Sequence, residues 1–255
     1  MSKIKKTITD EELKRYRRQI SLLGEEGQEK LKGTKILIAG AGGLGSPVVT
    51  YLALAGIGRI VIADDDVVEV SNLNRQILHW SADVGRKKTV SADEKLRAMN
   101  PYVELETVSC RIEETNVNDV VGDADLIVDA LDNFQTRYLL NRVAIAHDIP
   151  FFHGAVRGFY GQVMTIIPRQ TACLRCVFPQ SPSAEIFPII GATPGVIGSV
   201  QATEVIKYVT SKGELLTNKL LLWDGLTGET KIILVKRNPS CEDCSQTYTS
   251  TDQNL

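Results

Sequence analysis

The sequence predicts an α/β protein with a Rossmann-like, doubly wound and mainly parallel sheet, which antiparallel strands extend in the C-terminal half. Three observations support this prediction. Short apolar runs rich in Val, Ile and Leu alternate with helical stretches as far as Pro150, a glycine-rich turn joins the first run to a helix, and β-rich segments follow Pro150. An alternation of strands and helices is typical of a parallel sheet with helices on both faces.

The N-terminal half supplies the alternating elements. Thr9-Asp10-Glu11-Glu12 has the Ser/Thr-x-x-Glu form of a capping box and predicts the start of a helix. Lys35–Ala39 is a predicted strand, and it leads through the glycines into a helix over Ser46–Ala55, where Pro47 suits the first turn. Further strands are expected at Arg59–Asp64, Val103–Val108 and Asp125–Asp129, with helices near 87–99 and 134–147.

The C-terminal half has a different pattern. Two β-rich segments, Phe151–Ile167 and Leu220–Val235, predict antiparallel or mixed strands, and a helix is expected from about Val196 to Val209. The stretch Ile186–Thr203 carries no charge, but its prolines and glycines argue against a membrane span, so we expect a buried loop that leads into this helix. Because no long polar linker separates the halves, residues 1–255 are expected to form one domain with segments 1–33, 34–150 and 151–255.

Composition sets limits on the function. Hydrophobic residues make up 43% and charged residues 24% of the 255 residues, which is ordinary for a globular protein. The net charge of -2 provides no overall attraction to nucleic acids or anionic membranes, so any anion site must be local. The five cysteines are an odd number in a chain without an export signal, which predicts reduced thiols and a cytoplasmic location.

The glycine-rich turn carries the first functional signal. Gly40-Ala41-Gly42-Gly43-Leu44-Gly45 fits G-x-G-x-x-G between a strand and a helix, where backbone N–H groups can face a phosphate. This motif alone is weak evidence. Asp64 ends the second predicted strand and can bind a ribose hydroxyl, which makes a nucleotide the expected ligand.

The charged residues that follow favour ATP over NAD. A pyrophosphate diester is met by a helix N-terminus, whereas a triphosphate needs several cations and usually a metal ion. Arg75 and Lys88 are candidate phosphate-binding cations, and Asp132, after the strand at 125–129, is a candidate Mg²⁺ ligand. For any one of them alone a solvated surface charge is the commoner explanation, so the interpretation depends on their combination at the carboxyl ends of strands.

Two C-x-x-C pairs give the strongest single signal. Cys173, Cys176, Cys241 and Cys244 provide four thiolates in the spacing of a tetrahedral zinc site. A redox dithiol is the alternative, but two such pairs in one chain favour zinc. A closed shell of four cysteines leaves no open catalytic position, so we expect one structural Zn²⁺ that attaches the C-terminal segment to the rest of the domain.

The remaining cysteine and the histidines carry no recognisable catalytic pattern. Cys110 follows a predicted strand, where a buried, inert thiol is commoner than a nucleophile. His79, His147 and His153 have no Ser or Cys partner at a recognisable spacing, so we expect structural roles for all three.

Taken together, the motifs resemble those of one family, in the same order and over nearly the whole chain. They comprise Arg15-Tyr-Arg-Arg18-Gln19-Ile20, Gly40 to Gly45, Asp64-x-Asp66, Asn72-Leu-Asn-Arg75-Gln76, Lys88, Asp132-Asn133, both C-x-x-C pairs and Gly195-Val-Ile-Gly-Ser199. The sequence resembles the ThiF/MoeB/HesA family of ubiquitin-activating-enzyme-like proteins.

This resemblance implies an adenylyltransferase that uses ATP and Mg²⁺. Members of the family activate the C-terminal Gly-Gly carboxylate of a ubiquitin-like sulfur-carrier protein as an acyl-adenylate and release pyrophosphate. A separate donor then supplies sulfur. Segment 34–150 would bind the nucleotide, and segment 151–255 would bind the carrier and zinc. The implied nucleotide-binding residues are Gly40, Gly42, Gly43, Gly45, Asp64, Asp66, Asn72, Arg75, Gln76, Lys88, Asp132 and Asn133, among which Arg75, Lys88 and Asp132 would act in catalysis.

The family also forms homodimers in which an N-terminal arginine reaches the partner's ATP, and that arginine aligns with Arg18. Several relatives carry a cysteine before the Gly-Val-Ile-Gly helix for thioester or acyl-disulfide chemistry. Residues 177–195 contain no cysteine here, so the resemblance favours adenylation alone, as in MoeB-like members.

Two other functions remain open at this point. One is adenylation of a small or tRNA-borne carboxylate, as in tRNA threonylcarbamoyladenosine dehydratases, although the net charge of -2 argues against tRNA. The other is a non-catalytic Rossmann-like scaffold. The sequence does not identify the carrier or its pathway, among molybdopterin synthesis, thiamine synthesis and tRNA thiolation.

Overall fold

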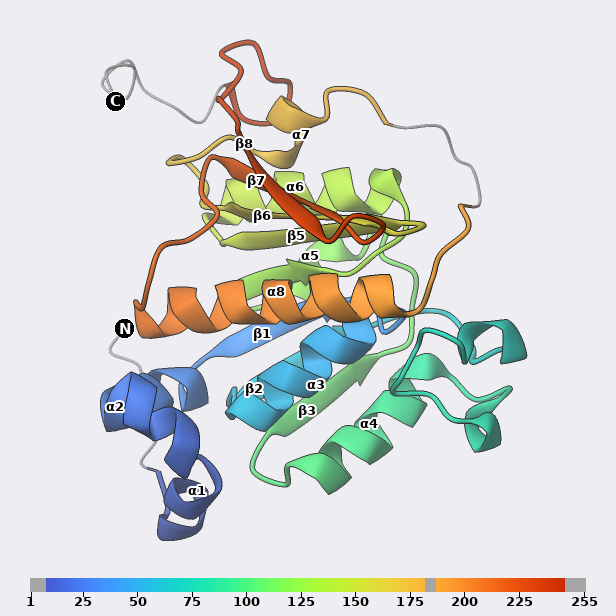
Figure 1. Cartoon of the computed structure of the whole chain (residues 1–255), viewed down its shortest axis with the longest axis vertical. Coiled ribbons are helices and arrows are strands. Elements are labelled where there is room, and N and C mark those ends of the chain that lie inside the picture. The colour runs from blue at the N-terminus through green and yellow to red at the C-terminus, as the bar shows by residue number, and fades with distance from the viewer. Residues whose placement is uncertain (1–7, 182–186, 246–255) are drawn as a thin grey trace.

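The computed structural model describes residues 8–181 and 187–245, which form a single eight-stranded sheet (Figure 1). The strand order is β3-β2-β1-β4-β5-β6-β7-β8, in which β1 to β5 are parallel and β6 to β8 are antiparallel. The strands are β1 Lys35–Ala39, β2 Arg59–Ala63, β3 Glu104–Val108, β4 Leu126–Asp129, β5 Phe151–Arg157, β6 Tyr160–Ile166, β7 Lys219–Asp224 and β8 Glu229–Leu234. The α/β class and the change from parallel to antiparallel pairing are therefore confirmed.

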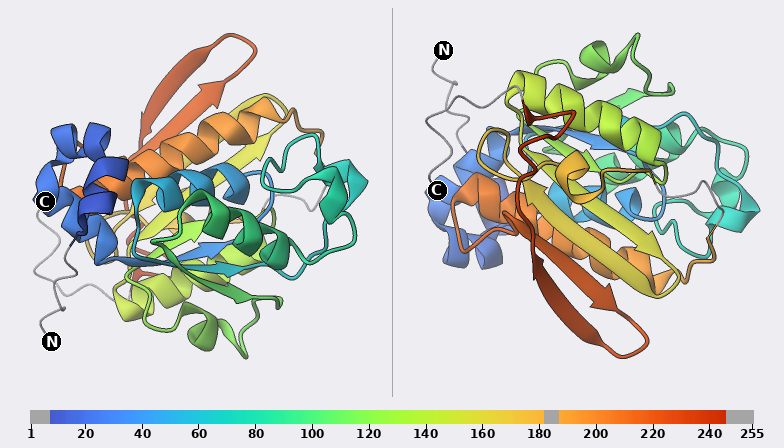
Figure 2. Two further views of the ribbon diagram at one scale, coloured as in Figure 1. Left: turned by 90° about the horizontal axis from the view of Figure 1, so that it is seen from below. Right: turned by 90° about the horizontal axis from the view of Figure 1, so that it is seen from above.

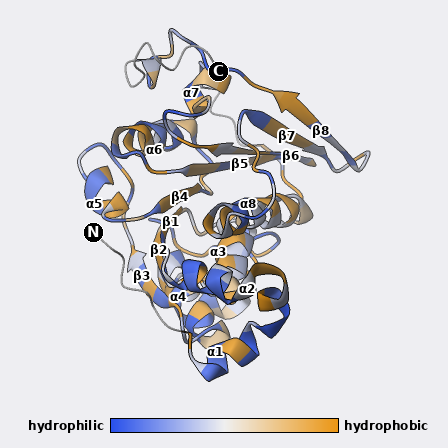
Figure 3. Cartoon of the chain, turned by 90° about the vertical axis from the view of Figure 1, so that its left-hand side faces the viewer, coloured by the Kyte–Doolittle hydropathy of each residue, from blue (hydrophilic) through white to orange (hydrophobic). Residues whose placement is uncertain are grey.

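Helices cover both faces of the sheet. They are α1 Asp10–Arg15, α2 Arg17–Lys32, α3 Gly45–Ala55, α4 Lys88–Met99, α5 Val117–Val121, α6 Phe134–His147, α7 Leu174–Val177 and α8 Ala192–Thr210, and two short 3-10 turns are η1 Val70–Asn72 and η2 Ser81–Asp83. Figure 3 shows α5 and α6 on one side of the sheet and α3, α4 and α8 on the other. Within the described residues, no helix combines the length and the apolar character that a bilayer crossing requires.

The alternation of side chains along β1 sends them into two of the three hydrophobic clusters, one on each face of the sheet. Leu37 and Ala39 of β1 pack under α5 and α6, whereas Ile36 and Ile38 pack under α3, α4 and α8. Successive side chains of a strand point to opposite faces, and here both faces are covered. This is why the central strands read as continuous apolar runs instead of alternating with polar residues.

The register of the parallel strands aligns the segments that follow them. Ala39 of β1 lies opposite Ala63 of β2 on one side and Asp129 of β4 on the other. The backbone continues the pairing by one residue, since Gly40 N–H donates to the Ala63 carbonyl and Ala130 N–H donates to the Ala39 carbonyl. The glycine-rich turn, Asp64 and the segment after β4 therefore start at one level of the sheet.

The C-terminal half extends this sheet through β-hairpins. β5 and β6 pair antiparallel, and β7 and β8 continue the sheet to an edge that projects from the body of the molecule (Figure 2). Every residue of β8 is exposed, including Ile232, Ile233 and Leu234. Both β-rich segments expected from the sequence are confirmed.

One expectation about the C-terminal half is wrong. The segment before α8 is not a buried loop, because Pro188 and Ile190 are exposed, and α8 begins at Ala192 rather than near Val196. Pro194 lies in the first turn of α8, where its missing N–H would have had no helical partner in any case. Ile186 falls outside the described residues.

The N-terminal helix begins as expected. Thr9 Oγ1 accepts the N–H of Glu12, and Glu12 Oε2 accepts the N–H of Thr9, which completes the capping box. The chain then passes from α1 into α2, whose regular path is broken at Gly24 with φ of +75°. Gln19 and Gln28 attach α2 to the last residue of α3, where both Nε2 atoms donate to the carbonyl of Ala55.

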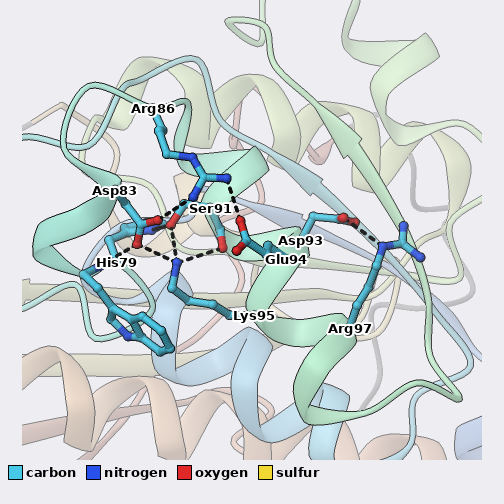
Figure 4. A network of polar contacts seen from close by, with 9 residues as sticks. His79, Asp83, Arg86, Ser91, Asp93, Glu94, Lys95 and Arg97 are labelled. Carbon is cyan, nitrogen blue, oxygen red and sulfur yellow. Dashed lines mark hydrogen bonds and ion pairs between the residues drawn. The ribbon is translucent and has the colours of Figure 1, made fainter.

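A buried polar network holds the segment between β2 and α4 (Figure 4). Lys95 Nζ donates to Asp83 Oδ2 at 2.5 Å and to Ser91 Oγ at 3.0 Å, and Asp83 also accepts from the N–H of Trp80. Lys95 and Asp83 are each about 5% exposed or less. Burial alone would raise the pKa of Asp83, but the hydrogen bonds from Lys95 and Trp80 outweigh it and lower this pKa to about 2.

Replacing Asp83 with Asn should leave the Lys95 ammonium buried without its counter-ion, at a cost of about 3 kcal/mol in the free energy of unfolding at pH 7. Because the folded-state pKa of Asp83 is depressed, its stabilisation is complete above the unfolded pKa near 4 and is lost as pH falls towards 2. The difference in the free energy of unfolding between wild type and Asp83→Asn, measured with urea, should shrink as pH falls over this range.

Asp93→Asn provides the matched control. Asp93 pairs with Arg97 on the exposed side of α4, the helix that also carries Lys95. Such exposed pairs contribute about 1 kcal/mol or less. A difference for Asp83→Asn that stays constant from pH 7 to pH 2.5 would contradict the role given to its carboxylate.

Candidate active site

The glycine-rich turn needs glycine at two positions for steric reasons. Gly40 has φ of +100°, and a Cβ there would lie 2.7 Å from the carbonyl oxygen of Ala130. A Cβ on Gly45 would lie 1.9 Å from the Gly40 carbonyl oxygen. No side chain caps α3, but the Ser46 N–H already donates to the Gly42 carbonyl and Pro47 has no N–H. An anion at this helix N-terminus would therefore meet the N–H groups that precede Ser46.

Asp64 lies beside this turn. Its Oδ2 accepts the N–H of Ala41 at 2.8 Å, and its Oδ1 accepts the N–H of Asp66 at 2.9 Å. Asp64 remains half-exposed. A carboxylate has about four lone-pair positions, so two stay available to ribose hydroxyls.

The two predicted cations come from different elements. Lys88, the first residue of α4, is 5% exposed, and its Nζ donates to Asp66 Oδ2 at 2.7 Å. Arg75 lies beside the glycine-rich turn, where a Cβ on Gly43 would be 3.5 Å from its Cγ, and its guanidinium donates to the Ser71 carbonyl. Arg75 is therefore near Gly43, whereas Lys88 is connected to Asp64 through Asp66, whose N–H Asp64 accepts.

The predicted amide side chains differ in what they bind. Asn72 Oδ1 accepts the N–H of Glu69, and Asn133 Oδ1 accepts the N–H of Thr136 as the cap of α6. These two side chains thus shape their own loops. Gln76 is 4% exposed and faces Gly42, and its buried Oε1 has no hydrogen-bond partner.

Asp132 is exposed, two residues beyond the level of Ala130. Leu131, the residue before Asp132, is held by buried side chains that the sequence did not reveal. Asp129 Oδ1 accepts the N–H of Leu131, while Arg137 donates to the carbonyls of Leu131 and Gly154. Asp129 is also bound by His153 Nδ1 at 2.7 Å, deep in the core.

Burial is the largest cause that lowers the pKa of His153, so this imidazole is neutral and donates from Nδ1 to the carboxylate. Gln162 Nε2 donates to the other ring nitrogen at 3.0 Å. His153 and Asp129 lie 24 residues apart, which is no recognisable spacing in the sequence. Only the pairing of β4 with β5 brings the two together.

Arg18 is not close to these residues in its own chain. It is exposed on α2, and its neighbour Gln19 contacts Ala55 at the end of α3. The glycine-rich turn lies at the other end of that 11-residue helix, which spans about 16 Å. Figure 1 shows α1 and α2 on the opposite side of the molecule from the segment between β2 and α4.

The four cysteines of the C-x-x-C pairs meet in space. Their Sγ atoms all lie within 4.8 Å of one another, with 3.7 Å between Cys173 and Cys176, 3.6 Å between Cys173 and Cys241, and 3.5 Å between Cys176 and Cys244. Tetrahedral Zn²⁺ with bonds of about 2.3 Å requires sulfur separations of about 3.8 Å, so the donor set fits. Cys110 lies elsewhere, half-buried, and its Sγ accepts from Asn116.

Comparisons with known proteins identify the relatives of this chain. Residues 16–243 match the ThiF family. The SAMP-activating enzyme E1 of Haloferax volcanii is 42% identical over 243 residues, which cover 92% of this chain and 90% of that protein. The sulfur carrier protein adenylyltransferase of Thermus thermophilus is 40% identical over 257 residues, covering 96% and 95%.

Solved structures share the fold. The crystal structure of Escherichia coli MccB superposes with a TM-score of 0.83 at 24% identity, over 93% of this chain and 74% of that one. At this identity the likeness shows the fold alone. From the match over residues 16–243 and the two relatives, it follows that the chain belongs to the ThiF family and is an adenylyltransferase.

Proposed function

We propose that this enzyme activates the C-terminal Gly-Gly carboxylate of a ubiquitin-like sulfur-carrier protein as an acyl-adenylate. A carboxylate oxygen forms a bond to the α-phosphorus of ATP, the bond from that phosphorus to the bridging oxygen breaks, and pyrophosphate leaves. The names of the two relatives, a SAMP-activating E1 and a sulfur carrier protein adenylyltransferase, support a carrier protein as substrate. A separate donor then supplies sulfur.

One observation carries the proposal. The register of β1 with β2 and β4 aligns the uncapped N-terminus of α3, the Asp64 carboxylate and the segment with Asp132 at the point where the strand order reverses. Open parallel sheets bind ligands in the crevice at such a switch point. The glycine-rich turn would receive phosphate, and Asp64 would bind the ribose.

The residues near the site suit a reaction that depends on position and charge. The incoming carboxylate is already a nucleophile, so no protein base is needed, and Lys88 and Arg75 would neutralise phosphate charge. Asp132 offers an exposed carboxylate for Mg²⁺, which when bound would neutralise further charge on the phosphates. Four of the five cysteines are engaged in the cluster, and Cys110 lies outside the site.

ATP–pyrophosphate exchange tests the proposed function. Exchange should depend on a carrier that ends in Gly-Gly, and a carrier that lacks its last two residues should give none. Exchange with a small acid or modified tRNA instead would replace the proposed substrate, and no exchange with any carboxylate would contradict the activity itself.

In the same assay, Asp132→Ala should lose nearly all exchange, because the cations alone leave much of the triphosphate charge unbalanced. Asp119→Ala, which removes an exposed carboxylate on α5, should keep the wild-type rate. Mg²⁺-dependent exchange at the wild-type rate in Asp132→Ala would contradict the role of Asp132.

We further propose one structural Zn²⁺ per chain at the four cysteines. Freshly purified protein should contain zinc at a ratio of one, and chelation should lower the melting temperature, because the metal links the C-terminal segment to α7. Cys173→Ser should have the same effect, whereas Cys110→Ser should not. Protein without zinc that keeps its full stability would overturn this assignment.

Arg18 is proposed to act on the site of a partner chain in a homodimer. Its distance from the glycine-rich turn in its own chain supports this arrangement. Arg18→Ala should lose roughly 10³-fold in exchange rate, by analogy with arginine fingers, while Arg17→Ala on the same exposed turn should lose little.

Mixing Arg18→Ala chains with Asp132→Ala chains should restore activity, because one site in each mixed dimer receives both intact side chains. Differential affinity tags would isolate these mixed dimers. If the isolated mixed dimers are inactive, action in trans is wrong.

A further inference from the structure

The peptide groups on both sides of Ala41, in the middle of the glycine-rich turn, are held by the half-exposed Asp64 and the buried His79. The N–H of Ala41 donates to Asp64 Oδ2 at 2.8 Å, and the Ala41 carbonyl accepts from His79 Nε2 at 2.9 Å. Ala41 is 1% and His79 is 3% exposed. Ser46 Oγ also reaches this carbonyl, but at the longer distance of 3.5 Å.

The hydrogen-bond partners of His79 determine which ring nitrogen carries its proton. A carbonyl only accepts, so Nε2 carries the hydrogen. Nδ1 lies 2.8 Å from Ser91 Oγ, and that oxygen receives a hydrogen bond from Lys95 Nζ at 3.0 Å. In the neutral ring Nδ1 carries no hydrogen and only accepts, so the Ser91 hydroxyl turns its own hydrogen to Nδ1, although Asp83 is also within its reach. Donors therefore point in one direction from Lys95 to Ala41.

The charged groups around His79 keep it neutral. Burial is the largest cause that lowers the pKa of His79, and the Lys88 and Lys95 ammonium groups of α4 act in the same direction. The hydrogen bond to the Ala41 carbonyl and the Asp64 carboxylate oppose them without reversing the shift. Asp83 neutralises Lys95 from the far side of the network. The directed chain therefore persists across the neutral pH range.

The Ala41 carbonyl matters because it shares a peptide plane with the N–H of Gly42. In a trans peptide the two bonds point in opposite directions, so a carbonyl fixed towards buried His79 turns the Gly42 N–H away from the core. Glycine at 42 would otherwise permit this plane to rotate freely. Asp64 does not prevent that rotation, because it holds the preceding peptide plane.

We propose that His79 is a positioning residue for the phosphate half of the nucleotide site: its Nε2–H holds the Ala41 carbonyl, and this aims the Gly42 N–H at the nucleotide's phosphate group. The inference rests on the proposed function, because it concerns the same site. His79 touches no substrate, and its effect is transmitted through one peptide plane. The adenosine half, bound through Asp64, does not depend on it.

Nucleotide binding to the full-length chain separates these two halves. For His79→Leu, the dissociation constant for ADP without added Mg²⁺ should rise roughly tenfold, the loss expected for one buried hydrogen bond, while that for adenosine stays within about twofold. His79→Gln, whose Nε2 can also donate, should recover most of the affinity for ADP. His147→Leu, a change at an exposed histidine, is the control.

Nitrogen NMR of the wild-type protein tests the tautomer of His79 directly. With three histidines in the chain, the signals are few. His79 should appear as the Nε2–H tautomer, and His153, which donates from Nδ1 to Asp129, should appear as the opposite one. Ser91→Ala should perturb the ring signals of His79 and leave those of His153 unchanged.

The outcomes distinguish this inference from the proposed function. Wild-type protein that binds neither ADP nor ATP would overturn both. If the wild type binds ADP and His79→Leu binds it equally well, or if His79 carries its proton on Nδ1, the positioning role alone is wrong. Equal losses for ADP and adenosine would also overturn it, because they indicate a general structural defect.

Discussion

The close approach of two backbones at the ends of β1 and β4 is the constraint on which the site depends. Gly40 meets the carbonyl of Ala130 so closely that even a Cβ would lie 2.7 Å from it, and Gly45 in turn packs on Gly40. The chain can therefore leave β1 in a tight turn and enter α3 directly. Beyond this contact the two segments diverge to opposite faces of the sheet, which opens the switch point to a ligand.

Polar side chains, most of them buried, then hold each diverging segment by its peptide groups. Asp64 and His79 bind the backbone of Ala41 on one side, and Asp129 and Arg137 bind the backbone of Leu131 on the other. Unpaired peptide groups at such depth would cost stability, so each buried side chain also satisfies the backbone. The loops that carry the candidate nucleotide-binding groups are in this way fixed by residues that need not touch a ligand.

The charge distribution agrees with a site that acts by local fields. The chain as a whole has a net charge of -2, yet Lys88 is almost buried beside the exposed Asp66 carboxylate and Arg75 lies next to Gly43. Both cations have oxygen partners, the Ser71 carbonyl for Arg75 and the Asp66 carboxylate for Lys88. A triphosphate brought to the turn would offer them stronger acceptors, since charged hydrogen bonds to phosphate are among the stronger ones in proteins.

The sequence by itself determined the α/β class, the strands and the longer helices, the two C-x-x-C pairs and the glycine-rich turn, because period, turn chemistry and spacing are local properties of the chain. The short helices α5 and α7 were not expected. The sequence also indicated that Asp64 ends one strand and that Asp132 follows another. Tertiary structure alone decided the register that aligns those ends, the exposed segment before α8, and the partners of His79 and His153. Strand pairing and helix packing bring such residues together from distant positions, and no local pattern encodes which buried donor will meet which acceptor.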